Sequence, residues 1–187
     1  MPWTTTSTTP QDAPYVAAQP MPRVRRCAQV CVAMGASLFG VLGVSHAWMT
    51  LSSEPHTGPM TPTDPATQEV MTRVGGLGFA PDAQVVFWDA WQGFHLSHSL
   101  GVLLFALVAL GGVFGRRGRA PTLGYSLLLA LTPLVYLAIS MRYWFEQPTH
   151  GIALGVLLLE AGVLLDVVSR VGPRVPPSFA RLGARHS

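Results

Sequence analysis

The sequence predicts an all-α membrane protein, a polytopic bundle of four transmembrane helices. Charged residues make up 11% of the chain, whereas an ordinary soluble domain contains roughly 25%. These few charges are concentrated in the connecting segments, so four long apolar stretches carry almost none. About 20 apolar residues span the hydrocarbon core when each residue adds about 1.5 Å to a helix. Each stretch is therefore long enough to cross a lipid bilayer.

The N-terminal segment, residues 1–26, is predicted to be a disordered cytoplasmic tail. Residues 1–22 are rich in Thr, Pro, Ala and Gln and show no apolar periodicity, a composition that cannot bury enough apolar surface to fold. The segment ends with Arg23, Arg25 and Arg26, which we expect at the cytoplasmic surface of the membrane.

The first transmembrane helix is predicted at about residues 27–50, because no charged residue occurs between Arg26 and Glu54. A second interpretation is a signal peptide, since an arginine group, an apolar run and Ser45-His46-Ala47 resemble its parts and a cleavage site after residue 47. The apolar run is long for a signal peptide, which favours an uncleaved helix.

The two cysteines, Cys27 and Cys31, lie one helical turn apart at the inner end of this helix, so they share a face. Their spacing is not that of a C-x-x-C redox motif, and cytoplasmic thiols are normally reduced. We interpret them as packing residues, with a disulfide or a metal site as the alternative.

The outer loop, residues 51–86, is predicted to contain one short amphipathic helix from Pro65 to Arg73. Asp64 is a favourable N-cap, and Pro65 suits the first helical position. A Gly-Gly pair follows the helix and should end it. The short helix would lie on the membrane surface or cap the bundle.

The three remaining transmembrane helices are predicted at about residues 87–114, 121–140 and 149–168. Pro133 lies in the middle of the third transmembrane helix and should kink it, because proline cannot donate the helical hydrogen bond. Residues 169–187 are predicted to form an arginine-rich cytoplasmic tail.

The arginines predict the orientation. Ten of the twelve lie in the N-terminal flank, the short 116–119 turn or the C-terminal tail, and two, Arg73 and Arg142, lie on the opposite side. By the positive-inside rule the arginine-rich side faces the cytoplasm, and an even number of spans places both termini there. This topology also accounts for the net charge of +3, so we expect a lipid bilayer and no nucleic acid as partner.

Small residues predict close helix packing. Gly151, Gly155 and Gly162 form a stripe on the fourth transmembrane helix, of the kind that lets helix backbones approach each other in a membrane. Glu160 lies on the opposite face of the same helix. If Glu160 faces the bundle, the glycine stripe is free to meet another subunit, so we predict a homodimer through this helix.

Polar residues within the apolar stretches are the candidate functional residues. His95 and His98 lie on one face of the second transmembrane helix with tryptophans and small residues, so this face should point into the bundle. Counting residues from the outer ends of the helices places Glu160 of the fourth helix at about the same depth in the membrane as His98. An intramembrane carboxyl group normally has a protein partner, and we predict His98 as that partner.

His46 and His150 also lie in the outer half of the membrane. Together with His95 and His98 they are candidate ligands of a cofactor such as haem, because imidazoles on two helices can ligate its iron. A divalent metal could instead be held by His95, His98 and Glu160.

Three interpretations of these residues remain open. His98 and Glu160 could satisfy each other and hold the register of the helices. They could belong to a haem or metal site of a redox protein. They could also be catalytic residues of a membrane enzyme, or of a proton-coupled carrier, in which a buried carboxyl exchanges a proton with the imidazole. The sequence contains no Gly-rich phosphate loop and no catalytic Ser or Cys motif, which argues against the chemistry of soluble enzymes. We expect a membrane protein of structural, assembly or accessory type with a polar His/Glu site in the bundle.

The stretch from Trp91 to Gly101, WQGFHLSHSLG, resembles the G-F-x-x-S-H-x-L-G stretch that opens the second helix in a group of small uncharacterised bacterial four-helix membrane proteins. Gly43 to His46 and Arg142 to Phe145 belong to the same likeness, which covers about residues 27–168. The resemblance implies this fold and a location in the bacterial inner membrane, and it implies no activity. The architecture also loosely resembles that of DoxX-like proteins. Four-helix quinone–thiol oxidoreductases differ, because they need loop cysteine pairs that this chain lacks.

Overall fold

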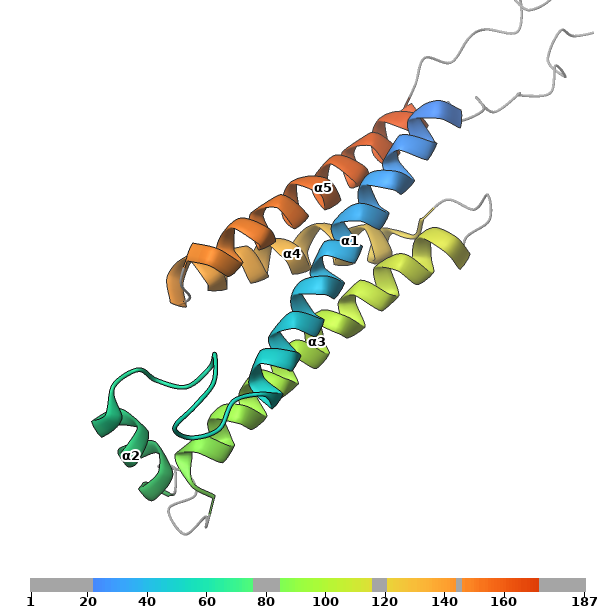
Figure 1. Ribbon diagram of the computed structural model, residues 1–187. Coiled ribbons are helices and arrows are strands. Elements are labelled where there is room, and N and C mark those ends of the chain that lie inside the picture. Colours follow the sequence, from blue (N-terminus) through green and yellow to red (C-terminus); the bar gives the residue numbers. More distant parts are fainter. Residues whose placement is uncertain (1–21, 76–84, 116–120, 144–145, 172–187) are drawn as a thin grey trace, which may run out of the picture.

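The computed structural model describes residues 22–75, 85–115, 121–143 and 146–171 (Figure 1). The helices in these residues are α1 (Pro22–Leu51), α2 (Pro65–Arg73), α3 (Phe87–Gly115), α4 (Leu123–Tyr143) and α5 (Glu146–Val171). The predicted all-α fold is confirmed. The rest of the two predicted tails lies outside the described residues.

Four of these helices, all but α2, are long and apolar enough to cross a membrane. Large apolar side chains are exposed on them, among them Leu107 on α3, Leu131 on α4 and Leu157 on α5. Such a surface is unfavourable in water and favourable in contact with lipid. The chain is therefore a multi-pass membrane protein.

The bounds of the transmembrane helices differ from the predictions by a few residues at both starts and ends. α1 begins at Pro22, so residues 22–26, which we expected in the disordered tail, are helical. Proline is favourable there because the first helical N–H groups have no partner within the helix. α5 begins at Glu146, a few residues earlier than predicted. α4 runs unbroken from Leu123 to Tyr143, with Pro133 buried inside it.

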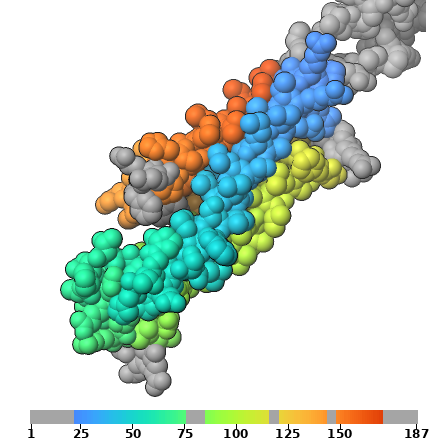
Figure 2. Space-filling model, viewed as in Figure 1, coloured from blue at the N-terminus to red at the C-terminus, as the bar shows by residue number. Residues whose placement is uncertain are grey.

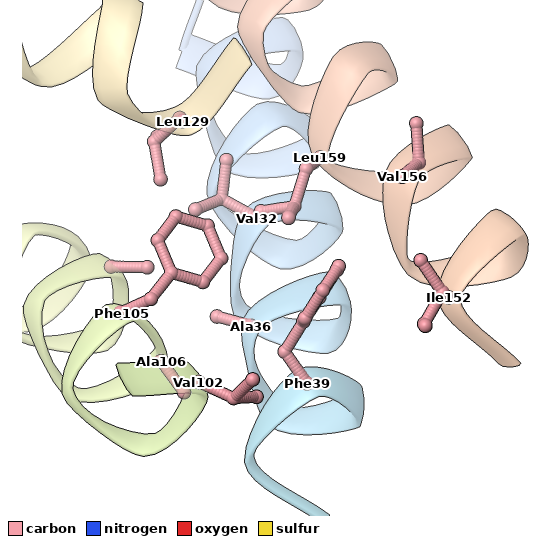
Figure 3. Packing of buried hydrophobic residues seen from close by; sticks show 11 residues of the cluster. Val32, Ala36, Phe39, Val102, Phe105, Ala106, Leu129, Ile152, Val156 and Leu159 are labelled. Atoms are coloured by element: carbon pink, nitrogen blue, oxygen red, sulfur yellow. The ribbon is translucent and has the colours of Figure 1, made fainter. Parts of the chain in front are cut away.

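α1 is the central helix of the bundle. It packs against α3 on one side and α5 on the other, while α4 packs on α5 (Figure 1). The space-filling view shows α1 lying between these two neighbours over most of its length (Figure 2). Phe39 of α1 contacts Phe105 of α3 edge to face in the core, with ring centres 5.5 Å apart (Figure 3). The buried core consists of Val32, Ala36, Phe39, Val102, Phe105, Ala106, Ala109, Leu129, Ile152, Val156 and Leu159.

Glycines on α5 let α1 and α5 approach closely. A Cβ at Gly155 would lie 2.7 Å from the Phe39 ring, and one at Gly162 would lie 2.6 Å from Val32. Gly151 also faces α1. This finding corrects the predicted homodimer interface, because the glycine stripe is occupied by α1 of the same chain. Helical periodicity identified a small-residue face correctly, but it could not identify which helix covers that face.

α4 meets α3 through two tyrosines that fit against two glycines. The hydroxyl oxygen of Tyr136 lies 3.3 Å from the position of a Cβ at Gly101, and the ring of Tyr125 lies against Gly112. The Tyr125 hydroxyl also donates a hydrogen bond to the carbonyl oxygen of Ala109 at 2.6 Å. The two tyrosines lie about three helical turns apart on α4, and the two glycines lie the same distance apart on α3. A single antiparallel register of the two helices therefore brings both pairs into contact.

Hydrogen bonds hold the segment between α1 and α3. Asp64 caps α2, because its carboxylate accepts from the Thr67 hydroxyl at 2.6 Å and from the Thr67 backbone N–H at 2.9 Å. These hydrogen bonds from the Thr67 side chain and backbone lower the pKa of the Asp64 carboxyl. Gln92 of α3 donates to the carbonyl oxygen of Ser53 at 2.8 Å. The predicted short helix over Pro65–Arg73 and its N-cap are confirmed.

Candidate functional site

Three histidines converge near the end of the α1–α3 pair that carries the outer loop. His46 comes from α1, and His95 and His98 come from α3, one turn apart. His46 Nε2 and His95 Nδ1 are hydrogen-bonded at 2.9 Å. The ring centres of His46 and His95 are 5.0 Å apart, and those of His46 and His98 are 5.7 Å apart. We call these three residues the histidine cluster.

Helix packing about one turn deeper in the bundle brings the cluster together. A Cβ at Gly43 would lie 3.1 Å from the side chain of Leu103, so α1 and α3 are in close contact there. His46 follows Gly43 by about one turn on α1, and His98 precedes Leu103 by little more than one turn on α3. Because the two helices run antiparallel, both steps lead toward the same end of the bundle.

Aromatic side chains surround the imidazoles. The ring centre of Trp91 lies 4.2 Å from that of His95, and the ring centre of Tyr136 lies 5.4 Å from that of His98. Tyr136 adds α4 to the site, so three helices contribute to it. The sequence-based predictions did not include Tyr136, because several other hydroxyl side chains occur in the same helix and nothing in the sequence distinguishes this one.

Two buried polar atoms beside the cluster, His95 Nε2 and Trp91 Nε1, have no hydrogen-bond partner among the described residues. Buried polar atoms are nearly always paired with protein, ordered solvent or a ligand. The indole N–H can only donate, whereas an imidazole nitrogen can donate, accept or ligate a metal, depending on its protonation. Among the described residues, His95 Nε2 is therefore unpaired, whereas His95 Nδ1 is bonded to His46.

Comparison of the chain with known proteins finds no matching family model, no matching curated protein and no matching solved structure. The chemistry of the histidine cluster is therefore inferred from its own geometry and surroundings.

The geometry of the cluster bears on two of the predicted cofactors. In the described parts of the chain, no group of three or more His, Cys, Asp or Glu side chains is placed so that it could hold a metal ion, so the three histidines would have to move to bind one. His46 and His95 instead share a hydrogen bond of 2.9 Å. A haem between these two residues would require its iron and the whole macrocycle to lie between opposed imidazoles, whereas the two rings are in direct hydrogen-bond contact and tilted by 54° to each other.

Glu160 does not meet His98, which corrects the predicted pair. On α5, Glu160 lies between Leu159 and Gly162, and Gly162 packs against Val32 of α1. His98 instead contacts His46, which is about 20 Å from Val32 along α1 at the helical rise per residue. Counting from the helix ends was misleading because α3 extends past the end of the α4–α5 pair (Figure 1). Glu160 Oε1 is buried without a hydrogen-bond partner among the described residues.

The other candidates lie outside the cluster. His150 is exposed near the start of α5, and no contact with the three histidines is observed in the described residues. Both cysteines are free thiols. Cys31 is half-buried, as expected of a packing residue, whereas Cys27 is exposed, so its predicted packing role is not supported.

Proposed function

We propose that this chain is an accessory-type membrane protein that binds a transition-metal ion through His46, His95 and His98. The observation that supports this function is the convergence of three imidazoles from two helices in an aromatic and apolar setting. Neutral imidazole suits zinc, copper, iron and nickel. The proposal replaces the set of His95, His98 and Glu160 suggested by the sequence.

The separations of the rings support this proposal. Bonds from zinc to imidazole nitrogen are about 2.0–2.1 Å, so two imidazoles on one tetrahedral ion have their ring centres about 5 Å apart. The observed separations from His46 are 5.0 Å to His95 and 5.7 Å to His98. An ion between His46 Nε2 and His95 Nδ1 would take the place of their hydrogen bond, and the donor ring would carry its proton on its other nitrogen. The two ligating nitrogens would separate to about 3.3 Å, and the His98 ring would turn toward the ion.

The surroundings favour metal binding over catalysis at this site. A membrane enzyme based on His98 and Glu160 would need the two side chains in contact, whereas Glu160 lies about 20 Å away along the bundle. The partners observed for the cluster are aromatic rings, Trp91 at His95 and Tyr136 at His98. These rings pack against the half-buried imidazoles and limit how they can turn, and a metal site needs its imidazoles held in a fixed orientation.

Elemental analysis of protein purified in detergent tests this function. We expect about one zinc or copper ion per chain after equilibration with the metal and removal of the excess. His95→Ala should lose that ion, whereas His150→Ala, which changes an exposed histidine outside the cluster, should keep it. Equal metal content in both variants would refute the proposal.

A second candidate function is proton transfer, which the hydrogen bond between His46 and His95 favours. Two hydrogen-bonded imidazoles can pass a proton from one ring to the other. This function would be supported instead if the protein binds no metal but carries protons across liposome membranes, and if His46→Ala abolishes that transport.

We further propose a location in the bacterial inner membrane with both termini in the cytoplasm. The distribution of arginines supports this orientation, because ten of twelve lie at one end of the predicted bundle. The histidine cluster would then lie toward the outer surface. Reporter fusions test the orientation, since alkaline phosphatase should be active after residue 60 and inactive after residue 187.

A further inference from the structure

Glu160 places a carboxyl group in the membrane-spanning part of α5. It follows Leu159, which is fully buried in the core, and it lies near the level of Val32 on α1. Its Oε1 atom is buried and has no hydrogen-bond partner among the residues that the structure describes. A buried polar atom is nearly always paired with protein, ordered solvent or a ligand, so a partner for Glu160 is expected.

The arginines of the described helices lie far from this carboxyl group. Along α1, Arg26 is about 9 Å from the level of Val32, and along α5, Arg170 is about 15 Å from Glu160. Arg170 is in addition paired with Asp166, and α4 carries its arginine in its last turn. An ionised carboxylate without a counter-charge is unfavourable in an apolar medium, and such a group normally takes up a proton instead.

A proline in α4 leaves one backbone carbonyl group without its helical partner. Pro133 is fully buried inside the helix, and because proline has no N–H it cannot donate to the carbonyl oxygen of Leu129, four residues earlier. Leu129 is itself only 3% exposed. In a membrane, a carbonyl freed by proline is normally satisfied by a group from a neighbouring helix. The Leu129 carbonyl therefore requires a hydrogen-bond donor.

The α4–α5 hairpin brings the carboxyl group and the free carbonyl to the same level. α4 packs on α5, and Leu129 precedes the end of α4 at Tyr143 by as many residues as Glu160 follows the start of α5 at Glu146. In an antiparallel pair with a short connection, such residues lie side by side. The lining of one small cavity supports this register, because it contains Leu129 of α4 together with Val163, which lies about one turn beyond Glu160 on α5.

We propose that Glu160 is a proton-binding site in the interior of the membrane, and that its bound proton forms a hydrogen bond to the carbonyl oxygen of Leu129. Proton binding removes the uncompensated charge and creates the O–H donor that the free carbonyl requires. Buried carboxyl groups of this kind occur in proton relays and ion pathways. The site is independent of the histidine cluster, which lies about 20 Å away along the bundle.

The other titratable groups near this site are engaged elsewhere or lie on another turn of their helix. Both tyrosines within α4 face glycines of α3, and the next carboxyl group on α5 is paired with an arginine of the same helix. On α1 the nearest titratable group is a half-buried thiol. These groups are Tyr125, Tyr136, Asp166 and Cys31.

Infrared spectroscopy of the full chain in phosphatidylcholine liposomes tests the proposal, because a protonated carboxyl and a carboxylate absorb at different frequencies. At neutral pH, the band of a protonated carboxyl should be present in the wild type and lost in Glu160→Gln. The matched control is Asp166→Asn, which removes a carboxylate that is paired with Arg170. This control should keep the band.

A second pair of variants tests the hydrogen bond to Leu129. Pro133→Ala restores an N–H donor to the Leu129 carbonyl, so the Glu160 carboxyl should lose its acceptor and its band should move to higher frequency. Pro148→Ala is the control, because Pro148 lies in the first turn of α5, where backbone N–H groups have no helical partner. This control should leave the band unchanged. Circular dichroism and gel filtration establish that each variant is folded.

Loss of carboxylate absorption alone in Glu160→Gln would overturn the proposal, since Glu160 would then be ionised at neutral pH. A carboxylate that appears in sodium buffer and is replaced by the protonated form in potassium buffer would also overturn it, and would indicate a sodium site. An identical band position in Pro133→Ala and the wild type would overturn the assignment of the Leu129 carbonyl as acceptor.

Discussion

His46 and His95 join the two longest helices of the bundle through a hydrogen bond of 2.9 Å between Nε2 and Nδ1. This hydrogen bond links α1 and α3 near the end of the pair that carries the outer loop. His98 packs against the same His46 ring. Stability and the proposed metal binding would therefore both depend on His46, and experiments can separate the two effects.

The hydrogen bond itself predicts an energetic coupling between His46 and His95. In a double-mutant cycle with alanine at each position in metal-free protein, we expect a coupling energy of about 0.6 kcal/mol and no more than about 1.7 kcal/mol. Reversible unfolding in mixed detergent gives the four free energies of unfolding. A cycle of His95 with His150, which lies outside the cluster, should show no coupling. Purely additive effects for His46 and His95 would contradict the observed contact.

Gly155→Leu should destabilise the single chain. A Cβ at this position would already lie 2.7 Å from the Phe39 ring, so the larger side chain forces α1 and α5 apart. We expect a loss of about 1–3 kcal/mol in the free energy of unfolding. Gly111→Leu is the matched control, since nothing lies within 4 Å of a Cβ there. A variant that changes its oligomeric state but keeps the stability of the wild type would instead favour the glycine stripe as a subunit interface.

Tyr125→Phe should loosen the contact between α3 and α4. The substitution removes the 2.6 Å hydrogen bond to the carbonyl oxygen of Ala109 and leaves the ring in place. A loss of about 0.5–1.5 kcal/mol in the free energy of unfolding is expected. Tyr143→Phe is the control, because Tyr143 is exposed at the end of α4. Equal stability of the two variants would mean that the Tyr125 hydroxyl contributes nothing.

Asp64 should make the order of α2 depend on pH in the acidic range. Hydrogen bonds from the Thr67 side chain and backbone lower the pKa of the Asp64 carboxyl below its ordinary value of 3.8. A lowered pKa in the folded state means that the stabilisation is complete above the ordinary value and is lost as the pH falls through the folded value. Hydrogen exchange at the first amides of α2 should therefore accelerate, relative to the intrinsic rate, as the pH drops below 3.8.

The variant Asp64→Asn distinguishes the capping of α2 by this side chain from the protonation of its carboxyl group. Asparagine caps helices about as well as aspartate, so exchange at neutral pH should stay close to that of the wild type and the acidic acceleration should disappear. Asp64→Ala should accelerate exchange at every pH. Persistence of the acidic acceleration in Asp64→Asn would assign the effect to another group.

Glu160→Gln should leave metal binding at the histidine cluster unchanged. The carboxyl lies near the level of Val32, whereas the cluster lies about 20 Å away at His46. The number of metal ions per chain and the dissociation constant should therefore equal those of the wild type. Loss of the ion in this variant would mean that Glu160 and the cluster are coupled through the bundle.

The candidate site was partly visible in the sequence. A helical wheel places His95 and His98 together, because residues three apart share a face. The contribution of Tyr136 depends on the register between α4 and α3, which the two tyrosine–glycine contacts set. The predicted pairing of His98 with Glu160 failed because depth was counted from helix ends that are not level in the bundle.

Composition by itself determined the helical class and the membrane-spanning segments. A hydrocarbon layer requires about 20 apolar residues per span, with all backbone groups hydrogen-bonded within the helix, so each span can be recognised without its neighbours. Only the tertiary structure decided that Gly155 faces Phe39, that His46 meets His95 and that Glu160 lies far from both. Periodicity defines a face on a helix. Which helix covers that face, and at what level along the bundle its residues lie, depend on how the other helices pack against it.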